Sequence, residues 1–142
     1  MQYFRLVGLF LAFFMMVQVA DAQQRRIEKA ENAFSSGRYF EAIDLFKYAY
    51  GKVDDRELKK ELIYKTALCY RYIDDVRQAE IWFRKAVRRD IENPLATLYY
   101  ADALLANGEY EEAKTNYKKY KQLVPDDIRA DKGVESCDFA IQ

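Results

Sequence analysis

Few residues of this chain have the types and the spacing that catalysis or metal binding requires. Its 142 residues include no histidine, so the commonest general base and metal ligand is missing. The two cysteines, Cys69 and Cys137, are too few to form a zinc site. The sequence contains neither a glycine-rich phosphate loop nor a Gly-x-Ser-x-Gly motif. It therefore predicts a protein that is not an enzyme, with no catalytic residue, no metal site and no cofactor.

Three pairs of adjacent aspartates are the remaining candidates for chemistry: Asp54-Asp55, Asp74-Asp75 and Asp126-Asp127. All three pairs fall at predicted turns or helix starts, where an aspartate side chain caps the first helical turn. None of them has the alternating carboxylates and the glycine of a calcium-binding loop. Helix capping is therefore the preferred interpretation of these pairs.

The charge balance argues against a polyanionic partner. Lysine and arginine together number 23, as do aspartate and glutamate, so no net charge attracts nucleic acid or anionic lipid. The hydrophobic fraction of 51% and the charged fraction of 32% are typical of a globular domain. Only two prolines and five glycines interrupt the chain, which favours a helical protein.

The amino terminus has the order of features found in secretory signal peptides. Met1–Arg5 carries one positive charge, Leu6–Val17 is an apolar run of twelve residues, and Ala20-Asp21-Ala22 offers a small-x-small cleavage site. The alternative is a membrane anchor, but a spanning helix needs about 20 apolar residues. We expect residues 1–22 to be removed and the mature chain to begin at Gln23. The mature chain is then expected to leave the cytoplasm.

The rest of the chain repeats one helical pattern three times. Ala42, Phe46 and Ala49 recur as Ala79, Phe83 and Ala86, and then as Ala113, Tyr117 and Tyr120. The first interval is 37 residues and the second is 34. The preceding turns recur in the same way, as Gly37-Arg38-Tyr39, Asp74-Asp75-Val76 and Gly108-Glu109-Tyr110. A period of 34 with a small-x-x-x-aromatic-x-x-small second helix is the signature of the tetratricopeptide repeat (TPR) family, which the chain resembles over residues 23–127.

This resemblance implies an all-α solenoid of three helix-turn-helix repeats, at about residues 23–59, 60–93 and 94–127. The three extra residues of the first interval fall within Val53–Lys59, which can lengthen a loop or a helix end. Residues 128–142 fit a fourth first helix that caps the stack through Ile128, Val134, Cys137 and Ile141. Because the pattern stops without a glycine or proline signal, we also expect the natural polypeptide to continue into further domains.

The two cysteines occupy equivalent places two repeats apart. Stacked hairpins would separate Cys69 from Cys137 by very roughly 20 Å, if each repeat adds about one helix spacing. A disulfide requires Cα atoms within about 7 Å. The sequence therefore predicts two separate buried thiols.

In TPR proteins the first helix of each hairpin lines a groove that binds partners. Carried over from the family, the groove positions are Ile27, Glu31 and Phe34; Tyr64, Leu68 and Arg71; and Leu98, Asp102 and Leu105. Each trio has the spacing of one helical face. The lysines, arginines and asparagine with which some TPR proteins hold a peptide carboxylate are not present as a set. The alternative interpretation is that these residues only pack the inner helices together.

A finer resemblance suggests a cellular setting. The segments SSGRYFEAIDLFKYA, NPLATLYYADALLANGEYEEAKTNYKKYKQLVPDD and GVESCDFA are similar to the amino-terminal TPR region of OmpA-like envelope proteins of Bacteroidetes. Some of those proteins act with the type IX secretion and gliding machinery. The resemblance implies a scaffold that docks a protein or peptide partner in the envelope. It also implies that the mature chain lies in the periplasm, in association with the outer membrane. The alternative is a structural spacer that positions downstream β-propeller and peptidoglycan-binding domains, so peptidoglycan would be bound only by domains outside this chain.

Overall fold

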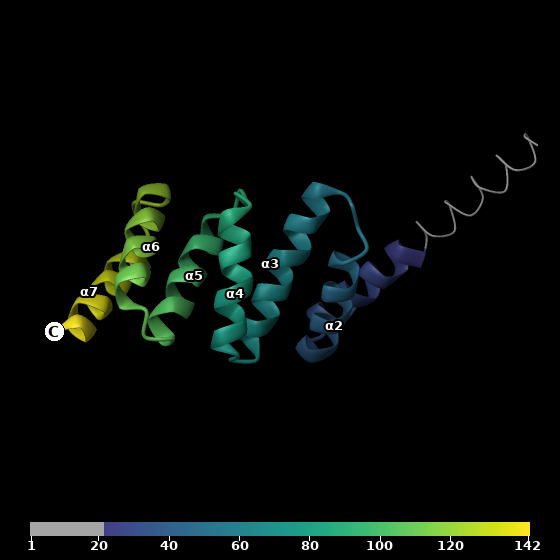
Figure 1. Cartoon of the computed structure of the whole chain (residues 1–142), viewed down its shortest axis with the longest axis horizontal. Coiled ribbons are helices and arrows are strands. Elements are labelled where there is room, and N and C mark those ends of the chain that lie inside the picture. The colour runs from purple at the N-terminus through teal and green to yellow at the C-terminus, as the bar shows by residue number, and fades with distance from the viewer. Residues whose placement is uncertain (1–21) are drawn as a thin grey trace, which may run out of the picture.

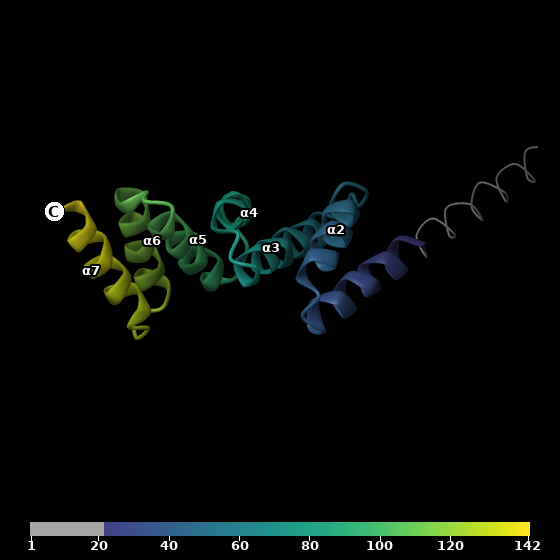
Figure 2. The same cartoon turned by 90° about the horizontal axis from the view of Figure 1, so that it is seen from below.

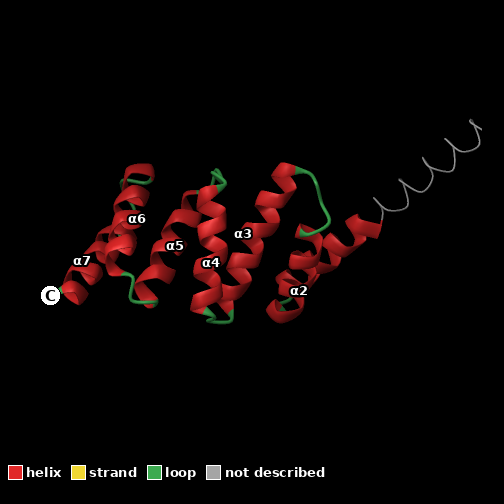
Figure 3. Ribbon diagram, in the orientation of Figure 1, coloured by secondary structure: helices red, strands yellow, loops and turns green. Residues whose placement is uncertain are grey.

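The computed structural model describes residues 22–142, so the predicted signal peptide lies outside the described residues except for Ala22. These residues form seven helices and no strand (Figure 3), which confirms the all-α prediction. The first helix covers residues 22–35, and the others are α2 (Tyr39–Tyr50), α3 (Arg56–Tyr72), α4 (Val76–Arg88), α5 (Pro94–Ala106), α6 (Tyr110–Leu123) and α7 (Arg129–Ile141). No helix within residues 22–142 combines the length and the apolar character needed to cross a membrane.

The helices follow one another along a single row. From α2 to α7 each helix packs against the next one in the chain, and α5 also contacts α7. Figures 1 and 2 show the first helix at one end of the row and α7 at the other. The first helix pairs with α2, α3 with α4 and α5 with α6, which gives the three predicted hairpins followed by one unpaired helix.

The turn inside each hairpin has the same backbone conformation. Gly37, Asp74 and Gly108 follow the first helix of their hairpins with φ angles of 73°, 60° and 84°. In each case the next residue donates its N–H to the carbonyl five residues earlier, as Asp75 does to Tyr70 at 3.0 Å. Glycine is favoured in this left-handed region, and aspartate is among the few other residues that tolerate it. The repeated turn in the sequence is therefore a repeated helix stop.

Helices α3 and α4 each begin with an aspartate that caps the first helical turn. Asp55 accepts a hydrogen bond from the backbone N–H of Leu58, and Asp75 accepts one from that of Gln78. These bonds confirm the capping interpretation of two aspartate pairs. Because Asp55 starts α3 at Arg56, this helix has 17 residues whereas α5 has 13. The extra residues of the first interval therefore lengthen α3, and the expected boundary at residues 59 and 60 falls inside it.

The repeated small and aromatic residues form the core. The alanines at positions 42, 79 and 113 and the aromatic residues at 46, 83 and 117 are all buried. The small side chains let two helices approach closely, and the rings fill the space between neighbouring hairpins. Trp82 is buried as well, with its ring edge-on to Tyr50 at a centroid distance of 5.8 Å.

The packed face of α7 agrees with the predicted one only in part. The buried residues of α7 are Ala130, Gly133 and Cys137. Of the four predicted cap residues, Cys137 is therefore buried and Val134 is partly buried against the core, whereas Ile128 and Ile141 are 63% and 44% exposed. The spacing of the buried set is also that of one helical face, and its small residues bring α7 close to α6. The fit of the small residue Gly133 against the bulky Tyr117 therefore sets the orientation of α7, which hydrophobicity alone predicted only in part.

Both thiols are buried and free, and we expect them to be chemically silent in the folded protein. Burial raises the pKa of Cys69 to about 12 and also raises the pKa of Cys137, so little reactive thiolate forms near pH 8. A thiol reagent should therefore label both cysteines only after unfolding in guanidinium, and a reducing agent should leave the melting temperature unchanged. Labelling of the native protein, or a Cys69–Cys137 bridge found by mass spectrometry, would contradict this prediction.

Candidate partner-binding groove

The groove face is the side of the row formed by the first helix, α3 and α5, and ionic contacts link these helices along it. Lys65 Nζ on α3 lies 2.6 Å from Glu31 Oε1 on the first helix. Further along, Arg71 Nη2 on α3 lies 3.8 Å from Asp102 Oδ2 on α5. The structure therefore brings together two of the predicted groove residues, Arg71 and Asp102, and it pairs a third, Glu31, with Lys65, which the sequence did not single out.

Two of the predicted groove positions lie in the core instead. Ile27 is 8% exposed and Leu98 is 1% exposed, so both side chains pack the inner helices together. Phe34 is partly buried against Tyr39, Phe46 and Tyr72. Partner contact through Leu98 would require the core to open, and we do not count it among the accessible residues.

The other predicted positions keep part of their surface. Tyr64, Leu68 and Leu105 are half-buried and pack against the core from its edge. Burial, with a smaller contribution from the nearby Tyr99, raises the pKa of the Tyr64 phenol, which therefore stays neutral and able to donate a hydrogen bond. Asp102 accepts a hydrogen bond from the buried Tyr117 hydroxyl at 2.8 Å, so it also helps to fix α6.

Tyr99 is a groove residue that the sequence did not reveal. Its ring lies 5.6 Å from that of Phe83, which in turn lies 6.2 Å from the ring of Tyr64. The guanidinium carbon of Arg71 lies 4.3 Å from the centre of the Tyr99 ring. The residue 34 positions after Tyr64 is Leu98, which was therefore predicted to lie in the groove. In α5, however, the next residue, Tyr99, lies on the groove face. The polar hydroxyl of Tyr99 was the available signal, because a tyrosine tolerates partial exposure better than a leucine does.

A cleft of about 280 Å³ opens beside this aromatic row, where α3 and α5 end. Its charged lining residues are Arg71, Asp74 and Asp102, and its remaining lining is aliphatic or aromatic. Within residues 22–142, no group of three metal-ligating side chains is placed to hold an ion. The cleft and the aromatic residues beside it form a partly apolar surface with a few fixed charges, which is suited to binding a segment of another protein.

A polar network on the other side of the stack holds the supporting helices. The buried Glu80 on α4 accepts a hydrogen bond from Asn107 at 2.6 Å and pairs with Arg84. Arg84 also donates to the Tyr100 hydroxyl at 3.1 Å, and Tyr100 donates to Glu112 at 2.7 Å. The network therefore joins α4, α5 and α6, and it fixes the helices that carry Phe83, Tyr99 and Asp102.

Comparison with known proteins identifies the fold. No protein-family model matches the chain, and no curated protein matches it. Among solved structures, the TPR-containing domain of a putative FK506-binding protein of Plasmodium falciparum matches with a TM-score of 0.68 and 25% identity, over 85% of this chain and 89% of that one. The chain has the fold of a TPR domain.

Two further solved structures are similar to this chain over nearly their whole length. The first TPR domain of Spaghetti (RPAP3), solved with an HSP90 peptide, has a TM-score of 0.70 and 24% identity, over 84% of this chain and 92% of that one. The Yersinia enterocolitica type III secretion chaperone SycD, solved with a peptide of the translocator YopD, has a TM-score of 0.70 and 19% identity, over 86% and 96%. Both of those proteins bind peptides.

Proposed function

We propose that this chain is a non-enzymatic docking module that holds a segment of a partner protein on its groove face. The observation that carries the proposal is the pair of half-buried rings of Tyr64 and Tyr99, which pack on the buried Phe83 beside an open cleft. Tyrosine and arginine contribute much of the binding energy at many protein interfaces. The peptide complexes of two proteins with similar structures support the same use of the fold.

We further propose that the module works in the bacterial cell envelope, with a partner that belongs to an outer-membrane or secretion assembly of the type IX kind. The signal-peptide pattern of residues 1–22 and the resemblance to OmpA-like envelope proteins support this setting. The proposal requires export. Mass spectrometry of the protein from an envelope fraction should therefore find a mature chain that begins at Gln23, and an intact Met1 would contradict cleavage.

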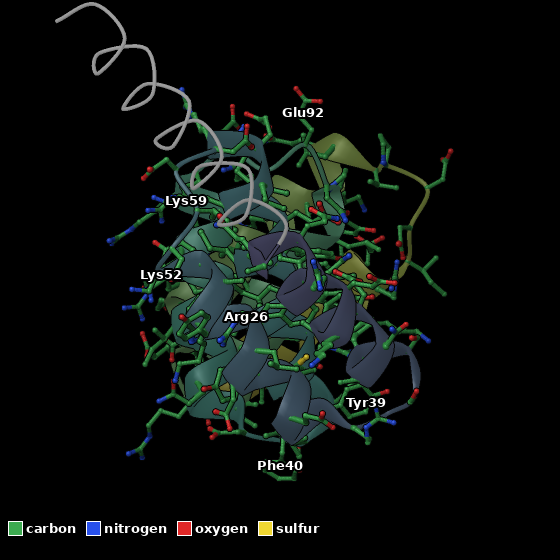
Figure 4. All side chains as sticks on the ribbon, turned by 90° about the vertical axis from the view of Figure 1, so that its right-hand side faces the viewer. Arg26, Tyr39, Phe40, Lys52, Lys59 and Glu92 are labelled. Atoms are coloured by element: carbon green, nitrogen blue, oxygen red, sulfur yellow. The ribbon has the colours of Figure 1, made fainter. Side chains whose placement is uncertain are left out.

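Site-specific photocrosslinking tests the docking surface. We expect a photoreactive phenylalanine analogue at Tyr64 or Tyr99 to crosslink one defined partner in living cells. The matched control is the same analogue at Phe40, which is 73% exposed and points away from the body of the protein at the edge seen in Figure 4. Equal crosslinking from Phe40 would contradict docking in the groove.

Loss of the two ring side chains gives a quantitative test. Tyr64→Ala combined with Tyr99→Ala should weaken partner binding at least about tenfold. Replacing an aromatic side chain that is buried at an interface by alanine often costs more than about 1 kcal/mol of binding free energy. Circular dichroism should show an intact helical fold, since both side chains lie at the edge of the core.

The second candidate function is the structural spacer, and one feature favours it. Phe139 on α7 is 83% exposed on the side opposite the buried Ala130, Gly133 and Cys137, so the end of the stack carries an exposed apolar residue on which a further domain would pack. A spacer needs no ligand in the groove. Unchanged partner binding by the Tyr64→Ala, Tyr99→Ala variant would therefore favour the spacer over the docking module.

A further inference from the structure

We infer that the cleft between α3, α4 and α5 selects a partner segment in which an apolar side chain stands next to a lysine or arginine. This inference rests on the proposed docking function and names the chemistry of the segment that the groove accepts. It follows from the shape of the cleft, from its charges and from the helix ends that surround it.

The walls and floor of the cleft are largely apolar. The apolar residues that line it are Val76, Ala79 and Phe83 of α4, together with Tyr99, Ala103 and Ala106 of α5. Three of these six are alanines, and their short side chains leave the open volume of about 280 Å³. That space accepts one aliphatic side chain of a bound segment, which would lose its contact with water there.

The charges that line the cleft do not cancel. Arg71 stacks on Tyr99 and lies 3.8 Å from Asp102, so its charge is already matched within the cleft. The Asp74 side chain makes no hydrogen bond or ion pair with any residue of the described part of the chain. Asp74 therefore lines the cleft with a carboxylate that has no cationic partner, and a cation from a bound segment would match it.

The surrounding helix ends add to this negative character. Both α3 and α5 end at the cleft, at Tyr72 and Ala106, and the carboxyl end of a helix carries a partial negative charge. Only α4 begins there, and its amino end is already capped by the Asp75 carboxylate. A carboxylate ligand would meet these negative ends and would have to draw Arg71 away from Asp102. The cleft therefore favours a cation.

Two matched aspartates allow a sharp test. Asp74 and Asp90 have positive φ angles of 60° and 51°, and asparagine tolerates this conformation as aspartate does. Both Asp74→Asn and Asp90→Asn remove one negative charge, but only Asp74 lines the cleft. The probes are three fluorescent peptides that differ at one position: Gly-Ser-Leu-Lys-Ser-Gly, Gly-Ser-Leu-Gln-Ser-Gly and Gly-Ser-Leu-Glu-Ser-Gly.

We expect the purified protein to bind the Leu-Lys peptide at least fivefold more tightly than the Leu-Glu peptide at low salt, with the Leu-Gln peptide between them. Asp74→Asn should remove most of this preference, and Asp90→Asn should keep it. Ala106→Trp should abolish binding of all three peptides, because Ala106 is an exposed lining residue and a large ring there fills the cleft.

The possible failures separate the inference from the docking function. Equal or tighter binding of the Leu-Glu peptide, or an unchanged preference in Asp74→Asn, would overturn the cationic selectivity. Binding that survives Ala106→Trp would overturn the assignment to this cleft. If none of the peptides shifts the NMR signals of Tyr99 and Ala106 at millimolar concentration, the inference is also overturned. The docking function is judged separately, by the crosslinks from Tyr64 and Tyr99.

Discussion

Replacing Gly133 by alanine is expected to lower the free energy of unfolding by about 2–3 kcal/mol, because it inserts a methyl group into a packed helix interface. A Cβ atom at Gly133 would lie 2.4 Å from Cε1 of the Tyr117 ring. The ring cannot easily move, since Tyr117 is buried and its hydroxyl donates to Asp102. The usual preference of helices for alanine over glycine, about 1 kcal/mol, acts in the opposite direction. Destabilisation would therefore report the steric clash.

Gly51 provides the matched control for this prediction. Its backbone has a φ of −74°, and a Cβ there would meet only backbone oxygens at 3.6 Å and 3.7 Å. Gly51→Ala should therefore be neutral or slightly stabilising. Urea unfolding followed by circular dichroism measures both variants. An equal effect of the two substitutions would show that α7 does not pack against Tyr117 in this way.

Deleting residues 128–142 should produce the largest loss of stability. The deletion removes the buried side of α7, formed by Ala130, Gly133 and Cys137, and exposes the rings of Tyr117 and Tyr120 on α6. Losing about 150 Å² of apolar burial corresponds to roughly 4 kcal/mol at about 25 cal/mol per Å². Typical domains have a total stability of about 5–15 kcal/mol. We therefore expect the truncated protein to melt at a much lower temperature or to aggregate.

A substitution at an exposed apolar residue of α7 is the control for the deletion. It distinguishes the loss of buried contacts with α6 from the mere loss of an apolar side chain. Phe139→Ser removes a large apolar side chain from α7, but that side chain is 83% exposed. The melting temperature of the Phe139→Ser variant should match that of the parent protein.

The ion pairs of α7 contribute little to its docking. Lys114–Asp138 and Lys121–Asp131 lie at the surface, so high salt should change the melting temperature of the parent protein little. A truncated protein that melts like the parent would show that α7 is an undocked segment.

The local sequence was sufficient to predict the repeating architecture. Small and aromatic residues that recur after 37 and then 34 residues can be buried only if one helical hairpin stacks on the next, and the structure buries them in that way. The turns were predictable for a related reason. A helix stop needs a left-handed residue, and Gly37, Asp74 and Gly108 are types that accept this conformation. The repeated core residues and the turn residues each form a short pattern that recurs along the chain, so both can be recognised in the sequence.

The tertiary structure decided which side chains reach the groove and which side of α7 is buried. Helical periodicity gives the spacing of a face but fixes its rotation only to within about one residue, so Leu98 was expected where Tyr99 lies. Likewise, the orientation of α7 depends on the fit of Gly133 against the Tyr117 ring, more than 15 residues away in the chain. Both outcomes are set by close packing between helices, which depends on the shapes of distant side chains and not on the local pattern.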